Sequence, residues 1–141
     1  MGMFSAKTFA REMIDDQRYE EAIAAATEAM TENPEDPEAH LDRGAAHDLL
    51  ARHEEAAVDF ERAFALDRKA GILSDDDLDD RLFEALRQWA LAIGETEPER
   101  GAQILRRYRD TFPKGRHDGD VDRWLSRLRG EKGPTWVKES V

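Results

Sequence analysis

Apolar residues recur at helical spacing along most of the chain, and charged or polar residues fill the positions between them. Leu78, Leu82 and Leu86 stand four residues apart, as on one face of a helix. Near the C-terminal end, apolar residues occupy positions i, i+3, i+4 and i+7: Val121, Trp124, Leu125 and Leu128. Valine is rare, so the β-branched runs that favour strands are missing. The pattern predicts an all-α protein.

Two stretches of the sequence superpose without gaps after a shift of 34 residues: YEEAIAAATEAMTEN (19–33) and HEEAAVDFERAFALD (53–67). The shift aligns small residues with one another: Ala10 with Gly44, Ala22 with Ala56, and Ala29 with Ala63. Asn33-Pro34 closes the first unit, because proline has no N–H with which to continue a helix. A repeat of this length predicts stacked helix pairs.

These features resemble the tetratricopeptide repeat, whose unit is two antiparallel helices with small residues at their crossing points. The resemblance implies a right-handed stack of antiparallel helix pairs, about three repeats in all. It also implies that Phe9, Met13, Phe60 and Phe64 fill the space around the small residues. The sequence departs from the family where Arg43 replaces a buried leucine, His47 and His53 replace aromatic residues, and Arg68 replaces a closing proline.

A third, longer unit follows the first two. Ser74 with Asp77 forms a Ser/Thr-x-x-acid box that predicts a helix start, and Gly94 predicts its end. Thr96 with Glu99 predicts the start of the partner helix, which Phe112-Pro113 closes. The linker from residue 69 to residue 74 exceeds what a regular array needs.

The last amphipathic segment, residues 117–130, is predicted to be a helix that covers the open end of the stack. Residues 1–130 therefore form one repeat domain with a C-terminal capping helix. Residues 131–141 are expected to be a flexible tail, in which Trp136 and Val137 are the apolar residues.

Composition narrows the classes of function. The net charge of −11 over 141 residues argues against a nucleic-acid partner. Cysteine is absent, which excludes disulfides and thiolate metal sites. No signal peptide or membrane-spanning stretch is visible, so a cytoplasmic protein without membrane contact is expected.

Candidate chemistry is sparse. His40 and His47 are seven residues apart, and His53 lies beyond the next turn, which is not the spacing of metal ligands on one helix face. The acidic run of Asp75, Asp76, Asp77, Asp79 and Asp80 lacks the glycine and terminal glutamate of a calcium loop, and it suits a helix N-terminus. No nucleophile or phosphate-binding motif occurs. We therefore expect no catalytic residue, metal or cofactor, with an enzyme as a minor alternative.

If the resemblance holds, the first helices of the repeats line a concave groove that binds a peptide or partner helix. The groove residues would be Lys7, Arg11, Ile14, Leu41, Ala45, Asp48 and Leu49, extended in the third repeat by Arg81, Glu84 and Gln88. Lys7 and Arg11 are expected to face Asp48 across this groove. The clamp with which one branch of the family grips chaperone C-termini matches only at Lys7, so that partner is disfavoured.

Charge is distributed unevenly along the chain. Residues 1–70 carry 8 basic and 17 acidic side chains, whereas residues 100–129 carry 9 basic and 4 acidic. A second candidate contact is therefore the basic set Arg106, Arg107, Arg109, Lys114 and Arg116. Its partner could be the acidic half of a second copy, which would make a homo-oligomer. The expected function is a protein-binding adaptor, with a dedicated chaperone for a secreted partner as the alternative.

Overall fold

The computed structural model describes residues 5–130, and these residues form seven α-helices and no strand. The helices are α1 (Ala6–Asp15), α2 (Tyr19–Glu32), α3 (Pro37–Leu49), α4 (His53–Ala70), α5 (Asp75–Gly94), α6 (Pro98–Thr111) and α7 (Asp118–Leu128). Within the described part of the chain, no helix combines the length and the apolar character needed to cross a membrane. The predicted tail, residues 131–141, lies outside the described residues.

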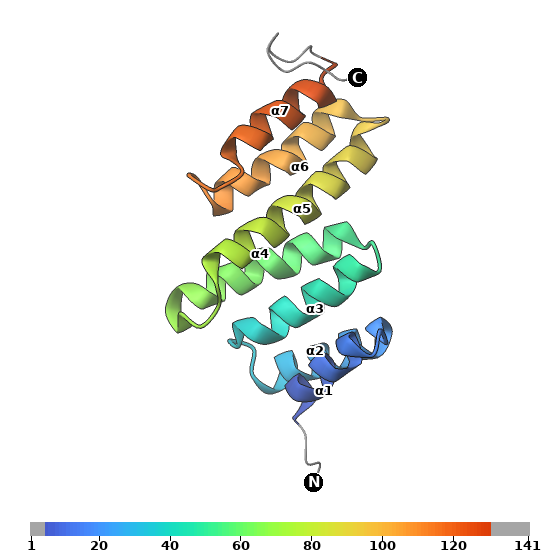
Figure 1. Cartoon of the computed structure of the whole chain (residues 1–141), viewed down its shortest axis with the longest axis vertical. Coiled ribbons are helices and arrows are strands. Elements are labelled where there is room, and N and C mark those ends of the chain that lie inside the picture. The colour runs from blue at the N-terminus through green and yellow to red at the C-terminus, as the bar shows by residue number, and fades with distance from the viewer. Residues whose placement is uncertain (1–4, 131–141) are drawn as a thin grey trace.

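The helices stack in chain order, so that α1 and α7 lie at opposite ends of an elongated molecule (Figure 1). α1 pairs with α2, α3 with α4 and α5 with α6, and each pair packs on the next through α2 against α3 and α4 against α5. α7 covers α6 at the C-terminal end. The prediction of an all-α stack of helix pairs with a capping helix is confirmed.

Small residues stand where the helices of a pair approach most closely. Ala10, Ala22 and Ala56 are fully or almost fully buried. A Cβ atom added to Gly44 would lie 2.7 Å from the ring of Phe60, so glycine is required there. The prediction for Phe9 is wrong, because its side chain is 41% exposed on the outside of α1 and does not fill the space around these small residues.

The helix boundaries follow local chemistry. The side chains of Ser5, Asp36 and Ser74 accept hydrogen bonds from the first turns of α1, α3 and α5. The Ser74 box is thus confirmed, with Asp77 N–H donating to Ser74 Oγ over 3.2 Å. The Thr96 box is wrong, because α6 starts at Pro98 and the Thr96 hydroxyl donates to the Ile93 carbonyl at 3.5 Å instead.

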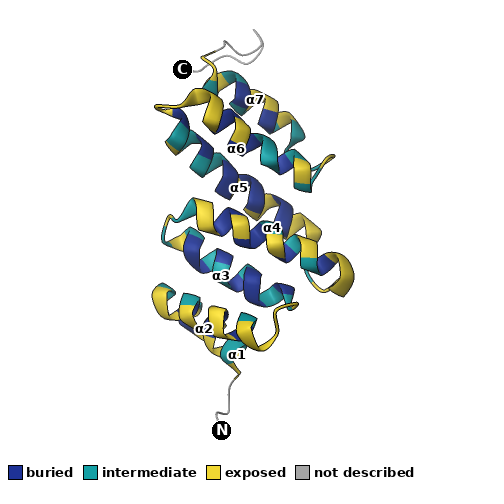
Figure 2. Ribbon diagram, turned by 180° about the vertical axis from the view of Figure 1, so that it is seen from behind, coloured by how far each residue is buried: buried dark blue, intermediate teal, exposed yellow. Residues whose placement is uncertain are grey.

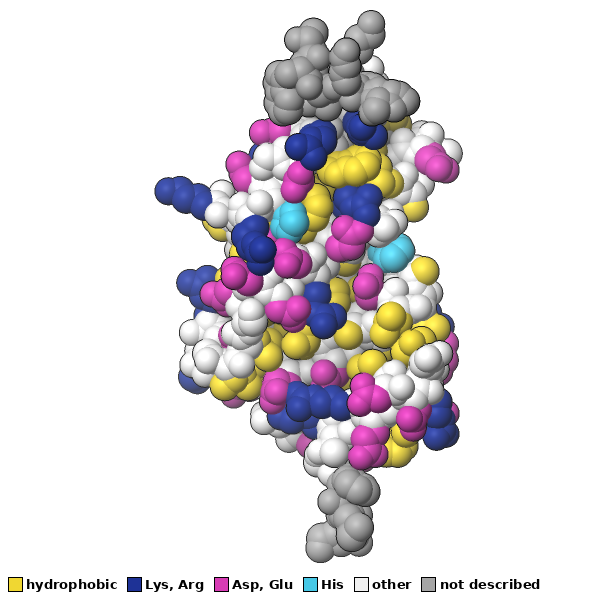
Figure 3. Space-filling view, in the orientation of Figure 1, with side chains coloured by type: hydrophobic (Ala, Val, Ile, Leu, Met, Phe, Trp, Pro, Cys, Tyr) yellow, Lys and Arg dark blue, Asp and Glu magenta, His cyan; other side chains and the backbone are white. Residues whose placement is uncertain are grey.

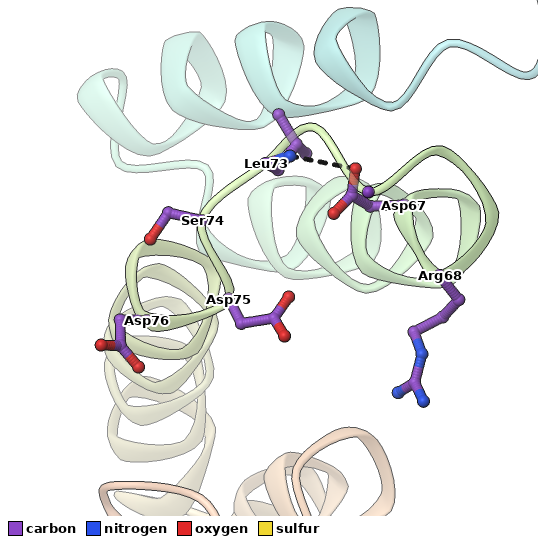
Figure 4. Close-up of a pocket in the computed structure, with 7 residues that line it drawn as sticks. Asp67, Arg68, Leu73, Ser74, Asp75 and Asp76 are labelled. Carbon is purple, nitrogen blue, oxygen red and sulfur yellow. Dashed lines mark hydrogen bonds between the residues drawn. The ribbon is translucent and has the colours of Figure 1, made fainter.

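The junction between α4 and α5 departs most from a regular repeat. With Arg68 in place of a closing proline, α4 continues to Ala70 and ends at Gly71, whose φ of 64° is in the left-handed region that suits glycine. The buried carboxylate of Asp67 then accepts hydrogen bonds from Ile72 N–H at 2.8 Å and Leu73 N–H at 3.1 Å. These bonds satisfy the backbone of the linker, and Figure 4 shows the second of them.

The core is unequal along the stack (Figure 2). One large cluster joins α4, α5, α6 and α7, and Val121 and Leu125 of α7 are buried in it. The first pair contributes only two small clusters, one of them made entirely of alanine: Ala10, Ala25 and Ala26. Since burial of apolar area scales with side-chain size, most of the hydrophobic stabilisation lies in the C-terminal half.

Candidate functional site

The first helices of the pairs, α1, α3 and α5, share one face of the molecule, which we call the inner face. Figure 3 shows this face, with apolar side chains gathered near the middle of the stack between clusters of charged ones. α1 packs directly against α3, whereas α3 and α5 make at most slight contact. All seven groove residues predicted from the sequence lie on α1 and α3.

Ion pairs cross the contact between α1 and α3. Lys7 Nζ lies 2.9 Å from Asp36 and 2.8 Å from Glu38, and Arg11 lies 2.5 Å from Glu38 and 3.2 Å from Asp42. Hydrogen bonding to Glu38 raises the pKa of Lys7, and the same contact lowers the pKa of Glu38. Both cations are therefore engaged within the chain.

Asp48 was expected to face these cations, but it pairs with His53 instead. Its carboxylate lies 3.3 Å from Nδ1 of His53, at the start of α4. Lys7 and Arg11 instead meet acidic residues in the first two turns of α3 and at its N-cap. The expected pairing of Lys7 and Arg11 with Asp48 is therefore wrong.

The apolar residues of the inner face lie beyond this ion-pair network. Ile14 is half-buried and packs beside the small cluster that contains Met13 and Ala46. Leu41 packs partly on the main core, and Leu49 is 54% exposed. Together with Ala45, these side chains form what we call the apolar strip: Ile14, Leu41, Ala45 and Leu49.

The α5 part of the inner face is polar, and its charges are paired along the helix. Arg81 lies 2.8 Å from Asp77, and Glu84 pairs with Arg87. Gln88 donates to Glu84 at 3.3 Å. Such i,i+3 and i,i+4 pairs stabilise a helix surface modestly.

The structure does not bring the predicted basic residues into one patch. Arg107 pairs with Glu61 of α4 and lies over the ring of Trp89 at 5.2 Å. Arg109 pairs with Asp118 and Asp122 near α7, and Arg116 lies 3.4 Å from Asp80 of α5. Within residues 5–130, Arg106 and Lys114 form no ion pair. The candidate basic contact is thus mostly neutralised within the chain.

A buried polar cluster, which the sequence did not reveal, ties α5 to α6 and to the loop before α7. Tyr108 is fully buried, and its hydroxyl donates to Asp79. The other Asp79 oxygen accepts from Arg116 N–H at 3.1 Å, and the Tyr108 oxygen accepts from His117 N–H at 3.0 Å. No motif spacing marks this cluster, because Asp79 and Tyr108 belong to different helices.

The His117 ring extends this cluster to the surface. It stacks on Phe83 with the ring centroids 4.3 Å apart, and its nitrogens lie 2.8 Å from Asp80 and 3.1 Å from Asp120. Burial lowers the pKa of His117, but the two carboxylates outweigh that effect, so the pKa lies above its ordinary value. Burial, followed by the hydrogen bond to Asp79, raises the pKa of Tyr108.

Ligand atoms of Asp79, Asp80 and His117 lie within 4.8 Å of one another, which is close enough to hold a metal ion. These atoms already have partners, however: Asp79 binds Tyr108 and Arg116, and His117 binds carboxylates through both nitrogens. We therefore assign the cluster to holding α5, α6 and the following loop together.

Two adjoining hollows open at the junction of α4 and α5. The larger, of about 590 Å³, lies between the end of α4 and the start of α5 (Figure 4). The smaller, of about 280 Å³, is lined partly by Phe64 and Phe112, whose rings pack together with centroids 4.5 Å apart. Both hollows share Arg68, Asp75 and Asp76, so their charge is mixed and selects no one class of ligand.

Two of the histidines considered as metal ligands are buried beside a charged pair. Arg43 binds Asp59 through two hydrogen bonds of 2.9 and 2.8 Å, and His47 Nε2 lies 4.0 Å from Asp59. Neither nitrogen of His40 makes a regular hydrogen bond. Burial lowers the pKa of both histidines, although the nearby Pro34 carbonyl opposes this for His40.

The sequence was compared with known proteins. No protein-family model matches it. No curated protein matches it significantly.

Proposed function

We propose that this protein is an interaction module that binds a segment of another polypeptide on its inner face. The observation that carries the proposal is the apolar strip. Leu49 remains largely exposed on the helix that also carries half-buried Leu41 and Ala45, while the neighbouring cations Lys7 and Arg11 are already paired. Contiguous apolar surface rimmed by polar groups is typical of protein-binding sites.

The repeat supports the proposal. Small residues at equivalent positions of the first two pairs, such as Ala22 and Ala56, are buried at helix crossings. We therefore propose membership of the tetratricopeptide repeat family, in which first helices line a binding surface. A binder also fits a chain in which the polar atoms of Asp79, Tyr108 and His117 are already engaged in hydrogen bonds with one another and with neighbouring groups.

A photo-crosslinking residue placed at Leu49 tests this function in the native host. We expect a discrete protein adduct from position 49. Val58 is the matched control, because it is 49% exposed and lies on α4 between residues that pack inward, Ala57 and Asp59. An adduct from position 58 but not from positions 45 and 49 would contradict the proposal.

A further inference from the structure

We propose that the segment bound by the inner face is a basic amphipathic helix. This inference rests on the proposed function and names the chemistry of the partner. It follows from the ion pairs near the apolar strip. The cations there have acidic partners within the chain, whereas some of the carboxylates have no cationic partner in the described part of it.

The cations near the apolar strip already form ion pairs within the chain. Lys7 and Arg11 each bind two carboxylates of the α3 region. Three further basic residues also have acidic partners: Arg18 with Glu21, Arg43 with Asp59, and Arg52 with Glu20. Arg62 and Lys69, which have no ion pair within residues 5–130, lie on α4 and not on the helices of the inner face. A partner with an acidic tip would therefore have to displace existing ion pairs.

Two carboxylates near the same strip, by contrast, lack a strong cationic partner. Asp15 at the end of α1 is exposed and has no ion pair within residues 5–130. Among the same residues, Asp48 of α3 has only His53 as a partner. These carboxylates without a strong cationic partner agree with the composition of residues 1–70, which contain 17 acidic and 8 basic side chains.

Helix geometry places Asp15 beside the strip. Lys7, Arg11 and Asp15 are spaced by four residues along one side of α1. Because Lys7 meets Glu38 and Arg11 meets Asp42, the next turn of both helices brings Asp15 level with Ala45 and Leu49 of α3. A free carboxylate thus flanks the most exposed apolar side chain of the inner face.

The partner's secondary structure follows from the absence of a sheet edge. The described elements are all helices, so the inner face presents no row of backbone groups to which an extended segment could add as a strand. A helix satisfies its backbone hydrogen bonds internally and can therefore pack on apolar side chains without backbone partners. Its apolar side would pack on Leu41, Ala45 and Leu49, and its basic flank would meet Asp15 and Asp48.

Two synthetic helical peptides of about 18 residues test this assignment, since that length gives about five turns. They share a leucine-rich side, and one carries Lys and Arg on its flanks where its twin carries Glu. Binding to the full chain is followed by fluorescence anisotropy at low salt. We expect the basic peptide to bind at least about tenfold tighter than its acidic twin, because complementary charges select partners.

Matched variants separate the inner face from the net charge. Asp15→Lys should weaken binding of the basic peptide several-fold at low salt and far less at 1 M salt, roughly the limit of strong screening. Asp110→Lys makes the same change of charge on α6, where the carboxylate is exposed, and should leave the affinity nearly unchanged. Leu49→Asp should abolish binding, whereas Val58→Asp should not.

The outcomes distinguish the two proposals. Equal or tighter binding of the acidic twin, or no binding of either peptide, overturns the basic helix as partner, while crosslinking from position 49 would still support an interaction module. Binding of the basic peptide that survives Leu49→Asp, or that falls equally with Asp15→Lys and Asp110→Lys, shows attraction to the whole acidic surface and overturns this inference.

Discussion

Tyr108 donates its hydroxyl hydrogen to the buried carboxylate of Asp79, across the contact between α6 and α5. Tyr108 stands three residues before the last residue of α6, the place that Ala29 holds in α2. A large side chain fits there because Gly115 has no Cβ, which would collide with the Tyr108 hydroxyl. At this position the third helix pair therefore has a buried tyrosine–carboxylate hydrogen bond where the first pair has a small residue.

Removal of the Tyr108 hydroxyl should destabilise the protein. Tyr108→Phe leaves a buried carboxylate with one partner fewer, and we expect a loss of about 1–3 kcal/mol in the free energy of unfolding. Denaturant unfolding measures this loss. Tyr19→Phe is the matched control, because half-buried Tyr19 packs beside the small cluster around Met13 and its hydroxyl forms no hydrogen bond with the described part of the chain. Equal losses of unfolding free energy in the two variants would show that the hydrogen bond between Tyr108 and Asp79 does not stabilise the fold.

The buried histidines should make stability fall in acid. Burial lowers the pKa of His40 in the folded state, so the unfolded chain binds a proton first as pH falls. The contribution is fully present above the unfolded pKa of about 6.5 and is lost as pH falls below it, with a slope of at most about 1.4 kcal/mol per pH unit. Asp59 favours the charged ring, whereas Arg43 and Arg62 oppose it.

His40→Leu should therefore flatten the decline in unfolding free energy between pH 7.5 and pH 5, about one unit either side of the ordinary histidine pKa. His117 provides a comparison of opposite sign. Its raised pKa gives stability that is present below the unfolded pKa and lost as pH rises through the folded one. His117→Gln should steepen the decline in acid. An unchanged slope for His40→Leu would show that His40 is not the responsible group.

Charge reversal at Lys7 and Arg11 should weaken the docking of α1 on α3. Lys7→Glu with Arg11→Glu turns every cross-helix pair into a repulsion, and we expect a loss of about 1–2 kcal/mol, given ~0.2–1 kcal/mol for each partly exposed pair. Thermal unfolding at low salt measures the loss, which should shrink in 1 M salt, roughly the limit of strong screening.

The control for this double variant is Arg62→Glu with Lys69→Glu, which changes two exposed residues of α4 that form no ion pair with other described residues. It makes the same change in net charge. A melting temperature lowered equally by both double variants would mean that self-repulsion of an acidic chain, rather than the pairing of α1 with α3, accounts for the effect.

The sequence predicted the elements better than the contacts between them. The 34-residue shift that aligns Ala22 with Ala56 was enough to predict stacked helix pairs, because a repeated pattern of small residues reflects a repeated helix crossing. Thr96 failed as a helix start because a capping box depends on backbone angles that two residue types cannot specify. The partners of Lys7 and Arg11 could not be read from spacing, since they depend on the register of α1 against α3.

The order of the helices has a consequence for synthesis on the ribosome. The pair that emerges first, α1 with α2, contains the weakest core, with alanine clusters and pairs of charges in place of large apolar side chains. The cluster that joins α4 to α7 is complete only when Val121 and Leu125 have emerged. During translation the early helices are therefore expected to associate only loosely until α7 completes the large core. The half of the molecule that is synthesised first is the less stable half.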